Sequence, residues 1–76
     1  MCADTPFRLP PDRLYRAQVQ AVEAELRIRI AVLVLQELVR IGDPDMPVEA
    51  VDTPVAHLAR AQSLLNEAVR LLTPPP

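Results

Sequence analysis

Few residues in this chain could carry out catalysis or bind a metal ion. His57 is the only histidine and Cys2 the only cysteine among 76 residues. No serine, cysteine or acid is spaced to form a triad-like arrangement with His57. One cysteine and one histidine cannot supply the three or four ligands of a structural zinc site. We therefore expect no enzymatic activity, no metal and no cofactor, and we interpret His57 as a structural residue at the edge of a helix face.

The acidic residues form two close pairs that suggest carboxylate chemistry as an alternative. These pairs are Glu23 with Glu25, and Asp43 with Asp45. An arginine follows each glutamate four residues later, which is the favourable order for an ion pair on a helix surface. We therefore expect most helix carboxylates to be solvated partners of arginine. Because Gly42 is the only glycine, the chain has no Gly-rich loop that could cradle a phosphate.

Three arginines provide the basis for a nucleic-acid hypothesis. Arg13, Arg16 and Arg27 gather on one side of the predicted first helix, and a two-fold dimer would double them into a modest basic strip. Glu23 and Glu37 interrupt this strip, and the net charge of the chain is -2. Phosphate binding needs clustered positive charge, and single-stranded binding also uses aromatic stacking residues. Binding of RNA or DNA is therefore our alternative hypothesis, and nucleic acid is not the expected partner.

The first half of the chain is predicted to be an arm followed by one long helix. Residues 1–11 contain three prolines and no periodic apolar pattern, which indicates an extended arm. Proline tolerates the first turn of a helix, and Asp12 there favours the helix dipole. Gly42 stands where a C-terminal cap is expected, and Pro44 stops any continuation. We predict a helix over about 12–41.

A linker and a second helix follow. Residues 42–53 are acidic and contain proline, which indicates a linker with room for one helical turn near 46–51. Thr53 and Pro54 form a favourable pair of N-cap and first helical residue. We predict a helix over about 54–72, ended by Thr73 and a proline tail at 74–76. Residues 12–73 would then form a single helical hairpin domain.

The segment Leu26–Ile30 permits a different structure. Its apolar residues alternate with arginine and two of them are β-branched, which is typical of a strand. Such a strand would need to pair with the same strand of a second subunit, with arginines facing the DNA major groove. A strand there would leave the helical pattern of residues 12–25 without a continuation. We therefore favour the helix and leave the intersubunit strand as an alternative.

The predicted first helix has more apolar surface than one partner helix can cover. A first stripe at heptad spacing comprises Leu14, Ala17, Ala21, Ala24, Ile28, Ala31, Leu35 and Leu38. A second stripe, about 150° away around the helix, comprises Tyr15, Val19, Val22, Leu26 and Leu33. The two stripes meet at Ile30–Leu35, which is apolar on nearly every side. A helix that is hydrophobic all round is normally buried all round.

The predicted second helix has a single broad apolar face. Its expected contact residues are Leu58, Ala61, Leu65, Ala68 and Leu72, with Leu64, Val69 and Leu71 beside them. This face can cover only one stripe of the first helix. A homodimer of hairpins would cover both stripes, as an all-α four-helix bundle. The expected oligomer or partner interface comprises Val19, Val22, Ala24, Leu26, Ile30, Ala31, Leu33 and Val34.

Chain length leads to the same expectation. A chain this short buries only about 60% of its unfolded surface and usually needs disulfides, a metal or oligomerisation. Oligomerisation is the option that this composition leaves. The longest apolar run, Ile30–Leu35, is far shorter than the ~20 residues of a membrane helix, so we expect no membrane and a cytoplasmic location with Cys2 reduced.

The sequence therefore predicts a non-enzymatic protein–protein interaction or regulatory module that acts through apolar helix faces. An inhibitor, an antiactivator, an adaptor and an assembly subunit all fit this description. Whether the second stripe serves self-association alone or docks a different protein of unknown identity stays open, because both uses need the same apolar helix face.

Overall fold

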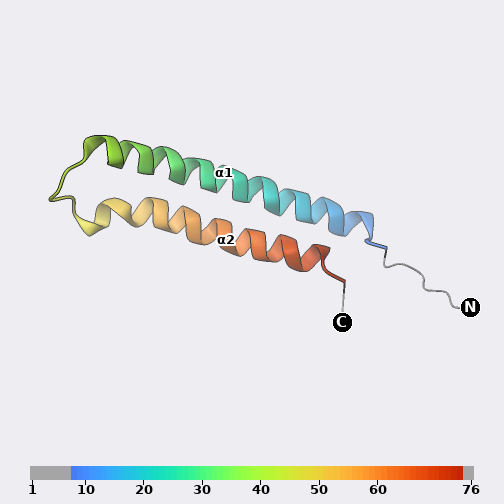
Figure 1. Cartoon of the computed structure of the whole chain (residues 1–76). Coiled ribbons are helices and arrows are strands. Elements are labelled where there is room, and N and C mark those ends of the chain that lie inside the picture. Colours follow the sequence, from blue (N-terminus) through green and yellow to red (C-terminus); the bar gives the residue numbers. More distant parts are fainter. Residues whose placement is uncertain (1–7, 75–76) are drawn as a thin grey trace, which may run out of the picture.

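Two antiparallel helices joined at one end make up residues 8–74, the part of the chain that this computed structural model describes (Figure 1). α1 spans Pro11–Ile41, a 3-10 turn, η1, spans Val48–Val51, and α2 spans Asp52–Leu72. No strand occurs between residues 8 and 74. The prediction of an all-α helical hairpin is confirmed. The intersubunit strand at Leu26–Ile30 is wrong, because this segment lies in the middle of α1.

The ends of α1 follow from proline and glycine. α1 starts at Pro11, one residue before the predicted start, and proline lacks only an N–H that would have no partner inside the helix. The backbone N–H of Arg13 donates to the carbonyl of Pro10 at 3.0 Å. At the other end Gly42 has φ +60°, and its N–H donates to the carbonyl of Leu38 at 3.1 Å. Glycine adopts this left-handed conformation without steric cost, so it ends the helix as predicted.

The start of α2 differs from the prediction. Thr53 is not the N-cap, because α2 begins at Asp52 and continues directly from η1. The N–H of Asp52 donates to the carbonyl of Glu49, so the turn before α2 satisfies a donor that a cap would otherwise serve. Pro54 lies within the first turn, where its missing N–H costs no helical hydrogen bond, and its side chain is buried.

Small side chains hold the two helices together. The buried residues of α1 are all alanine, and those of α2 include two alanines. The buried set, which we call the hairpin interface, is Ala17, Ala24, Ala31, Pro54, Ala61, Leu64, Ala68 and Leu71. Two clusters set the register, with Ala17 against Ala68 and Ala24 against Ala61. Alanine lets helix backbones approach closely, so these rows face each other.

On α2 the hairpin interface is rotated by one row from the predicted contact, and on α1 it buries only Ala17, Ala24 and Ala31 of the first stripe. Leu14, Ile28 and Leu35, which share that stripe, are exposed. On α2 the expected contact residues Leu58, Leu65 and Leu72 are likewise exposed. The physical reason is the closest approach of the alanine rows, which turns the larger side chains of the neighbouring row to one side.

Candidate interaction surfaces

The rows of large residues beside the hairpin interface lie on one side of the hairpin. On each helix they are about 75° around the axis from the centre of the interface. Because the helices are antiparallel, they turn in opposite senses when viewed from one end, so both rows point to the same side. The register places Leu14 level with Leu72, and Ile28 level with Leu58. We call this surface the leucine face: Leu14, Ala21, Ile28, Leu35, Leu58, Leu65 and Leu72.

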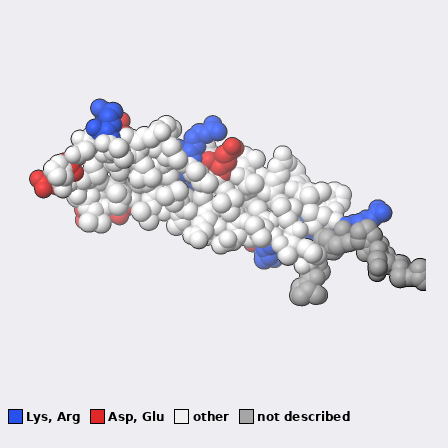
Figure 2. Space-filling model, in the orientation of Figure 1, with Lys and Arg blue, Asp and Glu red and all other residues white. Residues whose placement is uncertain are grey.

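The leucine face is accessible and uncharged. Its six large side chains are each 36–50% exposed. The apolar arc extends further around both helices, to exposed valines about 130° from the interface in rows that also hold Gln18, Glu25 and Gln62: Val32, Val39, Val55 and Val69. Figure 2 views this side of the hairpin, where white surface dominates and the charged atoms lie mainly along the edges. Near the connection, an apolar hollow of about 340 Å³ opens beside Leu35.

The opposite side of the hairpin is charged. Arg60 of α2 reaches across to Glu23 of α1, with Nε 3.9 Å from Oε2. Glu67 of α2 accepts hydrogen bonds from Arg70. These hydrogen bonds hold the pKa of the Glu67 carboxyl below its usual value, and the charges of Arg70 and Arg16 act in the same direction. The hairpin is therefore a layer one helix thick with an apolar side and a charged side.

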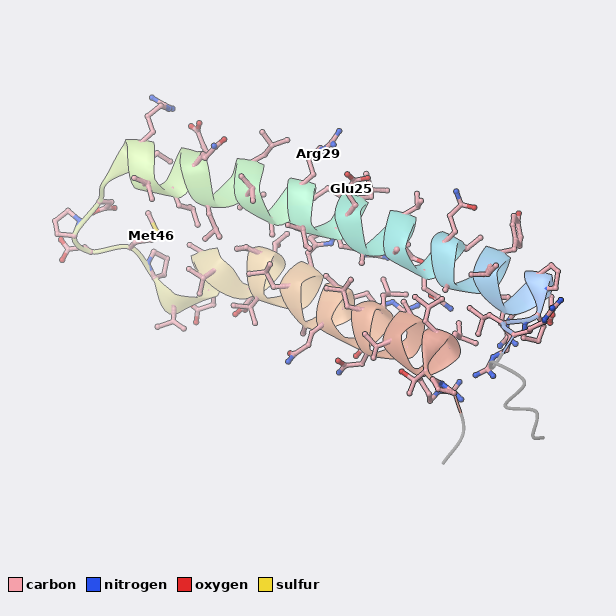
Figure 3. The ribbon with its side chains drawn as sticks, turned by 45° about the vertical axis from the view of Figure 1, so that its right-hand side comes forward. Glu25, Arg29 and Met46 are labelled. Carbon is pink, nitrogen blue, oxygen red and sulfur yellow. The ribbon has the colours of Figure 1, made fainter. Side chains whose placement is uncertain are left out.

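The predicted second stripe lies on the back of α1, away from α2. Its five members, Tyr15, Val19, Val22, Leu26 and Leu33, are 47–67% exposed. Figure 3 shows Glu25 and Arg29 on the same outward side of α1, where they form an ion pair with 3.8 Å between Oε2 and Nη2. The second stripe is therefore separate from the leucine face and bordered by charge.

The eight predicted interface residues separate into three groups. Val19, Val22, Leu26 and Leu33 are exposed on the second stripe, as described above. Ile30 and Val34 are half-buried. Ala24 and Ala31 are completely buried in the hairpin interface, and this corrects their assignment to a surface for another chain. Their small size serves the close contact with α2, so no surface of theirs is left for a partner.

The predicted arginine strip is largely engaged within the hairpin. Arg13 Nη2 donates to the backbone carbonyl of Arg70 at 3.2 Å, where its charge also favours the C-terminal end of α2. Arg27 Nη1 lies 3.2 Å from His57 Nδ1, and its Nη2 lies 3.5 Å from Glu23 Oε2. Because a guanidinium only donates, His57 accepts through Nδ1. Arg16 is exposed, so the three arginines do not form one free basic surface.

The described residues contain no group of three or more potential metal ligands. Within residues 8–74, neither helix is both long and apolar enough to cross a membrane. Comparison with known proteins finds no matching family model, no similar curated protein and no similar solved structure.

Proposed function

We propose that this protein is a non-enzymatic, homo-oligomeric interaction module that acts through the apolar surfaces of its helices. The exposure of the large aliphatic side chains carries this proposal. α1 and α2 bury mainly alanine against each other and present leucine, isoleucine and valine to the outside. A folded protein normally has the reverse distribution, and a large exposed apolar patch marks an interaction site.

Exposure of the leucine face leaves a large hydrophobic contribution to stability unmade for a chain of this size. Full burial of one leucine or isoleucine contributes about 1.5–3 kcal/mol. The six large residues of the leucine face are each a third to a half exposed. Leaving them in water therefore forgoes about 4–7 kcal/mol, which is comparable to the whole stability of a small domain. An isolated hairpin has no second layer with which to recover this contribution.

The chemistry of these surfaces suits helical partners. Aliphatic rows at heptad spacing recognise other amphipathic helices through packing, and they supply no nucleophile, acid or base for a reaction. Such a module can act by covering the apolar helix of another protein or by holding subunits together. An inhibitor, an antiactivator, an adaptor and an assembly subunit all use this kind of contact.

Light scattering coupled to size exclusion tests the proposal, with far-UV circular dichroism on the same sample. We expect a helical protein whose mass is at least twice the 8.4 kDa of one chain. A well-folded monomer at micromolar concentration would contradict the proposal, because the apolar surfaces would then be stable in water.

A further inference from the structure

We infer that the leucine face packs against the leucine face of a second copy of this chain, and that the two hairpins form a four-helix bundle. This inference rests on the proposed function and adds to it both the surface and its occupant. It also differs from the expectation drawn from sequence, in which four residues of the second stripe form the interface together with Ala24, Ile30, Ala31 and Val34.

The width of the apolar arc indicates an occupant that is two helices wide. In a four-helix bundle each helix contacts two neighbours about 90° apart around its axis. On α1 the apolar arc runs from the hairpin interface through Ile28 to Val32, and on α2 it runs through Leu58 to Val55. Both arcs widen toward the same side of the hairpin. A single helix in the groove would cover the leucine rows and leave the valine rows in water, whereas a second hairpin covers both.

The charge distribution permits pairing with an identical surface. A two-fold dimer contact brings each patch against its own copy, so a charged patch would oppose like charges across the axis. All seven positions of the leucine face are uncharged. The other side of the hairpin contains Arg16, Glu23, Arg60 and Glu67. The leucine face can thus meet itself without burying charge, while Glu25, in the row of Val32 and Val39, lies at its edge in an ion pair with Arg29.

The exposed area matches what a stable dimer requires. The six large residues of the leucine face are 36–50% exposed and the four flanking valines 43–79% exposed. Together they present on the order of 900 Å² of residue surface, against about 800 Å² per partner in a standard interface. The size of the side chains also varies along the rows, with Ala21 beside Leu14 and Ile28, which allows large residues to pack opposite small ones.

Residues 1–7 of the arm have too few large apolar side chains to cover the leucine face as a second copy of the chain would. Residues 1–7 contain two large apolar side chains, Met1 and Phe7, against six on the leucine face. A second copy supplies a surface of equal length and composition. In the resulting bundle the second stripe, on the back of α1, stays on the outside.

Sedimentation equilibrium on matched variants tests this inference. Leu65→Ala removes a large side chain of the leucine face, and Leu33→Ala makes the same change on the second stripe. Alanine has the highest helix propensity, so both variants keep their helices, and circular dichroism checks this. We expect Leu65→Ala to weaken dimerisation by about 10–100-fold, because each dimer loses two buried leucines, and Leu33→Ala to change it by less than about 3-fold. Leu65→Glu should give monomers throughout the micromolar range.

Two results would overturn the inference in different ways. If Leu65→Ala leaves the dimerisation constant within about 3-fold of wild type, the leucine face is not the contact, and the proposed function survives through another surface. If the wild-type chain itself is a folded monomer, the inference and the proposed function fail together.

Discussion

The alanine rows of the hairpin interface lead to a sharp prediction for one substitution. Ala61 is 2% exposed and lies in one cluster with Ala24 and Leu64. Leucine at position 61 would add three carbon atoms where two alanines set the distance between the helices. Overpacking of this kind costs about 1–3 kcal/mol. A domain of this length loses about 4–8 °C of melting temperature per kcal/mol, so we expect Ala61→Leu to melt about 5–20 °C below wild type.

Ala59 provides the matched control. It lies on the same helix two residues away and is exposed on the side of α2 that faces away from α1. Ala59→Leu makes the same chemical change with the same small effect on helix propensity. Thermal unfolding followed by circular dichroism at equal protein concentrations compares the variants. Equal melting temperatures for Ala61→Leu and Ala59→Leu would refute the alanine-lined interface.

Three further predictions concern the helix cap, an ion pair and the arginines. Gly42→Ala should lower the free energy of unfolding by about 1–2 kcal/mol in urea titrations, because alanine is strained at φ +60°. The added Cβ itself would meet only an ordinary contact at 3.6 Å. An unchanged urea midpoint would contradict the role of Gly42 as the helix cap. Glu67 has a pKa lowered from 4.5 by the hydrogen bonds from Arg70, so its stabilising contribution is present above that pH and lost as the pH falls through the lowered pKa. Wild type should therefore exceed Glu67→Gln in stability at neutral pH and lose this advantage in acid, and an advantage that persists at pH values below the lowered pKa would argue against the ion pair. Fluorescence anisotropy should detect no binding of RNA or DNA at about 50 mM salt, since Arg13 and Arg27 are engaged within the hairpin, whereas binding that weakens steeply with salt would favour the nucleic-acid hypothesis.

The sequence was sufficient to predict the helices, because their ends depend on local chemistry. Gly42 ends α1 as predicted, since its left-handed conformation needs only the residue itself and the carbonyl of Leu38. The start of α2 was harder to predict from the sequence. Thr53 has the chemistry of a cap, but the preceding turn at Val48–Val51 already provides backbone acceptors, and a single sequence does not specify that continuity.

The choice of buried row could not be predicted, because α1 is apolar on several adjacent rows. Heptad counting placed Ala17, Ala24 and Ala31 on one stripe with Leu14 and Ile28. The structure buries these three alanines against α2 and leaves Leu14 and Ile28 exposed on the leucine face. α2 covers one side of the alanine row of α1, and that side is determined only when the two helices pack together.

The leucine face was missed for the same reason. Four of its residues come from α1 and three from α2, and neither helix alone reveals that their rows share one side of the hairpin. A signal was present in α2, where Leu58, Leu65 and Leu72 recur every seven residues beside a parallel row of Ala61 and Ala68. Two adjacent apolar rows on a helix with one intramolecular neighbour indicate a second contact.

Isotope-filtered NOE spectroscopy tests the pairing of leucine faces most directly. A sample that mixes ¹³C-labelled and unlabelled chains reports only contacts between different copies. We predict intermolecular NOEs at the methyl groups of Ile28, Leu58 and Leu65, and none at Leu26 and Leu33. Intermolecular NOEs confined to Leu26 and Leu33, or their absence throughout a folded sample, would contradict the four-helix bundle built on the leucine face.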